Sequence, residues 1–205
     1  MSTAALIGKG PSLDHIDWAA VNSECGFSMW INETFLAAPK LGARVDAVIG
    51  QDREALDLFL DHTPAGVAIF TQQSQYHGGG LGRFSFRQPW FEFADKLGSC
   101  ASPQGYSTAA NAICVIAELL IKGERVDRLH LIGFDGLNWD RERWDAGMIY
   151  ANCIKDLKWY ASEVPHTKYY QAYEMVCDQV REAIAYTGLE IIDHALENAE
   201  NCVRA

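Results

Sequence analysis

The stretch Ala4-Ala5-Leu6-Ile7-Gly8-Lys9-Gly10-Pro11-Ser12 decides how the whole chain is interpreted. Its first half is a short continuous apolar run, which is typical of a parallel strand covered on both faces. Its second half is a glycine turn, and Ser12 is placed to cap the helical turn that follows. Strand, glycine turn and helix in this order predict the first βα unit of a doubly wound α/β sheet.

The rest of the chain repeats this alternation. The strongest helical segment runs from Ser107 to Lys122, begins at a Ser-Thr cap and is apolar nearly all round. A second long helix, amphipathic, is expected from roughly Tyr169 to Tyr186 and ends before Gly188. Further strands are expected at 27–31, 47–49, 67–71, 129–132 and 189–192. The pattern predicts one Rossmann-like domain over residues 1–205, with a mainly parallel sheet and helices on both faces.

Two segments interrupt the alternation and are expected to be loop insertions, near 72–90 and 137–147. The first is rich in glycine, and the second is polar and aromatic. Long loops at such points commonly carry function. Their aromatic side chains either stack on a base or sugar or belong to the core; these are Tyr76, Trp90, Trp139 and Trp144.

Composition narrows the class of ligand. The chain has 27 acidic against 17 basic residues and a formal net charge of −10, with no basic cluster to hold a nucleic acid backbone. A small-molecule partner is therefore expected. No apolar stretch is long enough to span a bilayer, and the N-terminus resembles a strand more than a secretion signal, so a cytoplasmic protein is expected. Six cysteines without any C-x-x-C pair are expected to be reduced and buried.

The glycine turn is the first candidate site. In a doubly wound sheet, ligands bind beyond the carboxyl ends of the strands, where glycines let backbone N–H groups approach an anion. The turn lacks the dinucleotide pattern G-x-G-x-x-G, because the residue at position 13 is Leu13. It also lacks the Gly-Lys-Ser/Thr ending of the Walker nucleotide-binding pattern. It predicts a phosphate site made by Gly8, Lys9, Gly10, Pro11 and Ser12. The alternative is a tight βα turn without a ligand.

The longer string Gly8-Lys9-Gly10-Pro11-Ser12-Leu13-Asp14-His15-Ile16-Asp17 resembles the G-N-G-P-S-L-x-x-I-D opening of the bacterial sialyltransferases of glycosyltransferase family 42. It is also similar to the opening of the related domain-of-unknown-function-115 proteins, which include archaeal 6-hydroxymethylpterin diphosphokinases. The resemblance continues in order over most of the chain, although the opening alone is distinctive. It implies a glycosyltransferase-A-like variant of the fold.

The resemblance also implies site residues. Asn32, Gln51, Ser107 and Thr108 would hold the nucleotide and sugar of a CMP-sugar-like donor, and the reaction would need no metal or other cofactor. Independently of the resemblance, Asp135 at the end of a buried strand is expected to bind a ribose hydroxyl or a metal, or to cap the turn that follows it. His166, before the last helix, takes the place of the family's general base, which a neutral imidazole suits. Its alternatives are a surface loop histidine or a helix cap.

Three functions remain open at this point. The first is a metal-independent glycosyltransferase that passes a sugar from a nucleotide donor to a hydroxyl acceptor. The second is a diphosphokinase, in which Mg²⁺ bridges nucleotide phosphates and is held by carboxylates near strand ends, for which Asp46, Asp52 and Asp135 are candidates. The third is a non-catalytic protein that sequesters a nucleotide. Lys9 stands where the family has Asn, and Arg83, Arg87, Arg141 and Lys168 are the other candidate phosphate cations. Homo-oligomers are compatible with all three.

Overall fold

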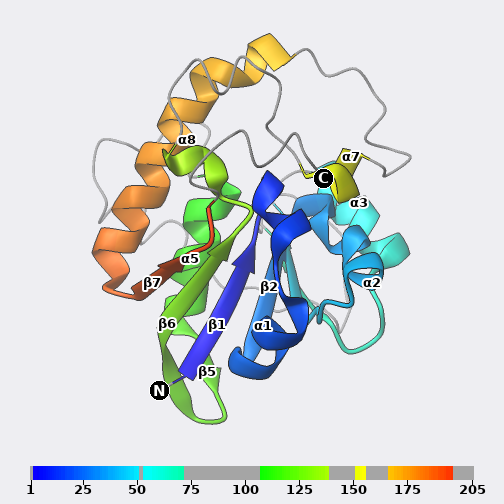
Figure 1. Ribbon diagram of the computed structural model, residues 1–205, viewed down its shortest axis with the longest axis vertical. Helices are drawn as coiled ribbons and strands as arrows, with labels where there is room; N and C mark the ends of the chain where they lie inside the picture. Colours follow the sequence, from blue (N-terminus) through cyan, green and yellow to red (C-terminus); the bar gives the residue numbers. More distant parts are fainter. Residues whose placement is uncertain (1, 51–52, 72–106, 139–150, 156–165, 196–205) are drawn as a thin grey trace.

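The computed structural model describes residues 2–50, 53–71, 107–138, 151–155 and 166–195. Within these ranges one sheet runs in the order β4-β3-β2-β1-β6-β5, and β7 pairs with β6 beyond this path (Figure 1). The strands are β1 (Ser2–Ile7), β2 (Phe27–Ile31), β3 (Ala47–Gly50), β4 (Ala68–Thr71), β5 (Leu120–Ile121), β6 (Glu124–Ile132) and β7 (Glu190–Asp193). Every pair is parallel except β5 with β6. The expected α/β class with a mostly parallel sheet is confirmed.

Strand β1 is the centre of the sheet. All six of its residues are buried, and its last residue, Ile7, lies level with Trp30 of β2 and Ile132 of β6. The chain places β2, β3 and β4 on one side of β1 and β6 and β7 on the other. Strand order therefore reverses between β1 and β6. The loops that leave the carboxyl ends of β1, β2 and β6 consequently meet at one edge of the sheet, called here the carboxyl edge.

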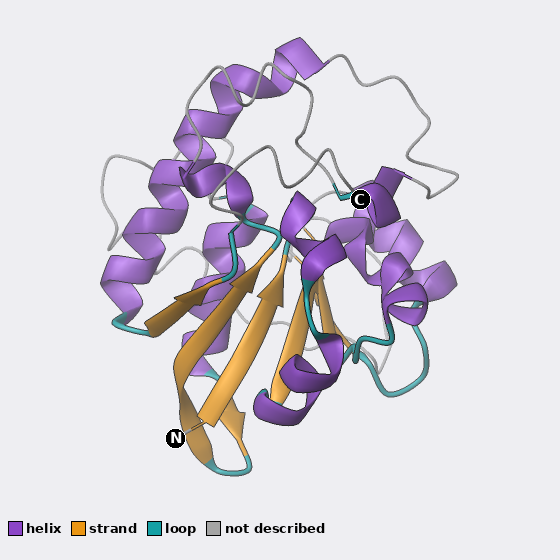
Figure 2. Ribbon diagram, viewed as in Figure 1, coloured by secondary structure: helices purple, strands orange, loops and turns teal. Residues whose placement is uncertain are grey.

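Each face of the sheet carries its own hydrophobic core, because successive strand residues point to opposite faces. Ala4 and Leu6 pack in the core with α5 (Thr108–Glu118) and α8 (His166–Thr187). Ala5 and Ile7 pack in the other core with α1 (Trp18–Glu24) and α3 (Arg53–His62). Helices thus cover both faces, as expected (Figure 2). The other short helices within the described residues are η1 (Pro11–His15), η2 (Asn32–Ala37), α2 (Ala38–Leu41), η5 (Asp135–Asn138) and α7 (Asn152–Lys155).

The expected helix from Ser107 to Lys122 is too long by one turn. It ends at Glu118, and Leu120–Ile121 forms β5, which pairs with the start of β6. Lys122 and Gly123 both have positive φ, 53° and 86°, which makes the two-residue hairpin turn that joins β5 to β6. Strand β6 therefore begins at Glu124, earlier than the expected 129. The last helix also begins earlier than expected, at His166.

The expected loop insertion at 72–90 lies outside the described residues, and the one at 137–147 enters them only with the end of η5. No described helix combines the length and the apolar character needed to cross a membrane.

Burial raises the pKa of the Cys25 and Cys114 thiols to about 11 and that of Cys153 to about 12. The cysteines within the described ranges are buried, as expected: Cys25, Cys114, Cys153 and Cys177.

Candidate functional site

The glycine turn is closed by contacts within the chain. Gly8 N–H donates to the carbonyl of Ile132 at 2.7 Å, and Gly10 N–H donates to the carbonyl of Gly133 at 2.8 Å. A Cβ on Gly8 would lie 2.6 Å from the Gly133 oxygen, which is closer than real Cβ atoms approach. The glycines of this turn thus let the backbone after β1 pack directly against the backbone after β6.

Asp135 completes this closure. Its Oδ2 accepts from the Ser12 amide at 3.0 Å and from Ser12 Oγ at 2.9 Å, while Ser12 Oγ accepts from the Gly133 amide at 2.8 Å. Ser12 and Asp135 are both fully buried. The carboxylate of Asp135 therefore takes the place at the Ser12 amide that a bound anion would take. The amides of Gly8, Gly10 and Ser12 thus have acceptors within the chain, and in this structure they are not the free donors that the expected phosphate site requires.

A short helix is fastened over the same turn. The Ala151 amide donates to the carbonyl of Lys9 at 2.9 Å. Asp14, in η1, accepts from the amide of Asn152, and its other oxygen accepts from the amide of Cys153 at 3.1 Å. Asp14 thus caps α7, which is distant in sequence, and fixes the backbone of that helix beside the glycine turn.

The carboxyl end of β2 carries a second group of polar residues. Asn32 has a φ of 50°, in the left-handed region that an asparagine tolerates better than most residues. Its Oδ1 is buried and has no hydrogen-bond partner among the described residues. The next residue, Glu33, forms an ion pair with Lys9 of the glycine turn, with side chains 10% and 26% exposed. Strained backbone and an unpaired buried acceptor at one residue are features that cluster at ligand sites.

Ser107 and Thr108 begin α5. Ser107 Oγ accepts from the Ala110 amide at 3.2 Å, and the Ser107 amide donates to Gln179 of α8 at 2.7 Å. Ser107 is therefore a helix cap that also joins α5 to α8, and Thr108 beside it is half-buried. Because α5 ends beside the start of β6, it runs antiparallel to the strands, and its N-terminus lies towards the carboxyl edge. That end of a helix favours negative charge.

Two expected site residues are not placed with the others. Gln51 lies outside the described residues. His166 is the first residue of α8, but its side chain is not among those the structure describes. Since α8 leads into the start of β7, its first turn lies on the carboxyl side of the sheet (Figure 1). The sequence predicts that His166 lies in the loop before the last helix, whereas in the structure it is the first residue of that helix.

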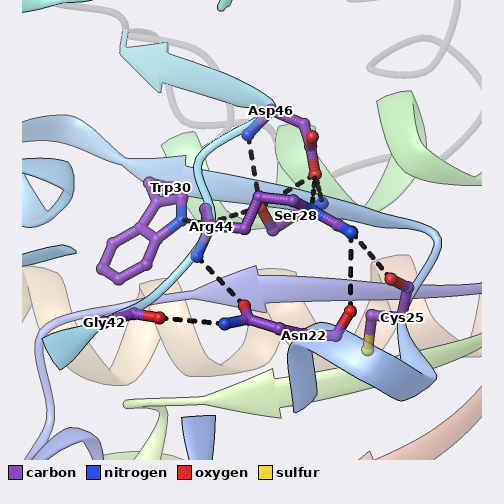
Figure 3. A network of polar contacts seen from close by, with 7 residues as sticks. All are labelled: Asn22, Cys25, Ser28, Trp30, Gly42, Arg44 and Asp46. Carbon is purple, nitrogen blue, oxygen red and sulfur yellow. Dashed lines mark hydrogen bonds and ion pairs between the residues drawn. The ribbon is translucent and has the colours of Figure 1, made fainter. Parts of the chain in front are cut away.

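A separate polar network lies at the opposite edge, where β2 and β3 begin (Figure 3). Arg44 donates from Nη2 to the carbonyl of Cys25 and from Nε to Asp46 Oδ2, both at 2.7 Å. Asp46 Oδ2 also accepts from the Ser28 amide at 2.8 Å, and the carbonyl of Arg44 accepts from Trp30 Nε1 at 2.9 Å. This network fastens the segment before β3 to the end of α1 and the start of β2.

The network also bears on the expected Mg²⁺ site. Asp46 precedes β3, whereas Asp135 follows β6, so the two carboxylates lie at opposite edges of a parallel sheet. The expectation that they share one metal ion with Asp52 is wrong for this pair, and Asp52 lies outside the described residues. Within the described ranges, no three His, Cys, Asp or Glu side chains are grouped to hold a metal ion.

A histidine pair lies between β6 and the end of β7, with His130 buried and His194 half-buried. His130 Nδ1 is 2.9 Å from His194 Nε2, and the rings stack with centroids 5.0 Å apart. On its other side, His130 Nε2 is 3.4 Å from Glu24 Oε1. Burial lowers the pKa of both histidines. The pair joins the last strand to the sheet and is not part of the glycine turn.

Glu33 is the residue that sequence reasoning missed. It directly follows Asn32, and its position after β2 could have marked it, because acidic residues there are common in nucleotide-binding sheets.

Comparison of the chain with protein-family models, with curated proteins and with solved structures gives no significant match. The resemblance to glycosyltransferase family 42 thus depends on the residues quoted from the sequence.

Proposed function

We propose that this chain is a nucleotide-dependent transferase with a Rossmann-like, glycosyltransferase-A-like sheet, whose donor lies at the carboxyl edge. Lys9, Asn32 and the N-terminus of α5 would contact the donor. The acceptor hydroxyl would attack the anomeric carbon of a nucleotide sugar, the bond from that carbon to the phosphate oxygen would break, and the nucleotide would leave. His166 would take the proton of the acceptor hydroxyl, as a neutral imidazole can near neutral pH.

The observation that carries the proposal is the state of Asn32. The left-handed φ of Asn32 is a conformation that few residues other than glycine adopt, and an unpaired buried acceptor costs about 1–3 kcal/mol. Proteins retain such costs where a ligand relieves them. The amine of a base or the hydroxyl of a sugar would supply the donor that Asn32 Oδ1 lacks.

The charge of the phosphate must be met without the amides of the glycine turn. The Lys9 ammonium and the N-terminus of α5 are the described groups that favour an anion at this edge. Positioning of the reacting groups and stabilisation of the leaving nucleotide would supply much of the rate acceleration.

A diphosphokinase is the second candidate, and one observation favours it. Lys9 pairs with Glu33, and this ion pair weakens the attraction of the ammonium for an added anion. A nucleoside triphosphate at this site would then need a divalent cation to neutralise it, which is how Mg²⁺ acts in phosphoryl transfer.

Thermal unfolding with added nucleotides tests the proposal. The protein is heated with CMP, with a CMP-sugar, and with ATP in the presence and absence of Mg²⁺. A ligand at one hundred times its Kd stabilises the native state by about 2.7 kcal/mol. Stabilisation by CMP compounds supports the sugar transferase, and stabilisation by ATP with Mg²⁺ alone supports the diphosphokinase. No stabilisation by any of these contradicts both.

Two variants separate binding from catalysis. Asn32→Gly removes the side-chain acceptor and tolerates the left-handed φ, so the free protein should be at least as stable as the wild type while losing the stabilisation by nucleotide. His166→Ala should keep nucleotide affinity and lose turnover, whereas a sequestering protein has no turnover to lose. Undiminished nucleotide stabilisation of Asn32→Gly would contradict the placement of the site.

A further inference from the structure

Glu33 is a buried carboxylate that the proposed reaction does not use. The residue is 7% exposed, and among the described residues Lys9 is the one group that pairs with it. A carboxylate has two oxygens and about four acceptor positions. One ammonium leaves much of that capacity unfilled, and burial without full pairing is costly for a charged group.

The position of Glu33 in the sheet indicates what it would bind. It follows β2, and β2 pairs directly with β1, whose carboxyl end continues into the glycine turn. In sheets that bind nucleotides, an acidic side chain about twenty residues after the glycine turn accepts hydrogen bonds from the ribose hydroxyls. Glu33 follows Gly10 by about this distance, and its contact with Lys9 brings the carboxylate to the turn.

We infer that Glu33 recognises the vicinal hydroxyls of a ribose, so that the ligand class is a ribonucleotide and not a deoxyribonucleotide. The inference rests on the proposed function, because it assumes a nucleotide at the carboxyl edge. Glu33 Oε1 contacts Lys9, and the other carboxylate oxygen accepts from the sugar. Lys9 is then a positioning residue that orients the carboxylate through their ion pair, in addition to its place near the phosphate. Asn32, next to Glu33, contacts the same ligand.

The test compares each ribonucleoside monophosphate, AMP, GMP, CMP and UMP, and also ATP with Mg²⁺, with its 2′-deoxy counterpart. Kd values are measured by calorimetry on the wild-type protein. A hydrogen bond to a charged group makes a difference on the order of ten- to a hundredfold in Kd, so the ribonucleotide should bind more tightly by that factor. Glu33→Gln should reduce the preference to a few-fold.

A matched variant controls for net charge. Asp61→Asn removes one negative charge from an exposed position on α3, and it should leave the ratio of the two Kd values unchanged. The ratio is the readout because loss of any carboxylate raises affinity for a phosphate in general.

The two ideas fail in different ways. If none of these nucleotides or their deoxy counterparts binds, the assumption of a nucleotide site is overturned, and the inference is overturned with it. If ribonucleotide and deoxyribonucleotide bind the wild type equally well, the role of Glu33 is overturned and the nucleotide site remains. If Glu33→Gln keeps the full preference for the ribonucleotide, the role of Glu33 is overturned as well. The wild-type comparison needs no variant, so the inference can be refuted even if Glu33→Gln does not fold.

Discussion

Ser12→Ala tests whether the glycine turn is a packed structural joint. The hydroxyl accepts from the Gly133 amide at 2.8 Å and donates to Asp135 Oδ2 at 2.9 Å, in a fully buried position. Its removal leaves the Gly133 N–H without this acceptor, at about 1–3 kcal/mol, and removes one donor from a buried carboxylate. We expect a loss of about 3 kcal/mol in the free energy of unfolding, or roughly 6–12 °C in Tm for a chain of this size.

The measurement is urea unfolding followed by tryptophan fluorescence, together with a thermal scan. Ser23→Ala is the matched control, because Ser23 is exposed on α1 and its replacement should change stability by about 0.5 kcal/mol or less. If Ser12→Ala is as stable as the control, the amides of the turn are not held as described. The turn would then be open to an anion, as the sequence alone predicts.

Three further predictions concern parts of the molecule away from the turn. Arg44→Met should cost about 1–2 kcal/mol in urea unfolding, since the bonds to Cys25 and Asp46 are lost, and should leave nucleotide Kd values unchanged. The pKa of His130 and of His194 is lowered in the folded protein, so the unfolded state binds more protons below about pH 6.5. The free energy of unfolding should therefore fall as the pH drops below this value. His130→Gln should make this dependence of stability on pH less steep, and an unchanged dependence would contradict the role given to His130. Four of the six cysteines are buried, namely Cys25, Cys114, Cys153 and Cys177. At most two thiols should therefore react rapidly with DTNB in the native protein. Rapid reaction of a third thiol would show that this burial is wrong.

The sheet could be predicted from sequence because its signal is local. The apolar runs that end at Ile7 and Ile31 are strands with nearly the expected bounds, and so is the run that ends at Ile132 at its carboxyl end. The end of α5 could not be predicted in the same way. Leu119 and Leu120 continue a helical apolar pattern, and it is the hairpin turn at Lys122 and Gly123 that takes Leu120 into a strand.

The candidate site was only partly predictable. The glycine turn, Asn32 and Ser107 lie on the carboxyl side of the sheet, as the motif indicates. The contact between Ser12 and Asp135 joins residues more than a hundred positions apart, and no local pattern shows that the Ser12 amide donates to a carboxylate of the protein. The pairing of Lys9 with Glu33 likewise depends on the parallel register of β1 and β2.

The central claim is that a nucleotide binds at the carboxyl edge, between β2 and α5. Amide chemical-shift mapping tests it most directly, with ¹⁵N-labelled protein titrated separately with CMP and with ATP plus Mg²⁺. We expect one of these ligands to shift the amides of residues 32–34 and 107–109, and to leave those around Arg44 unchanged. Shifts gathered around Arg44, or no shifts with either nucleotide at millimolar concentration, would contradict it.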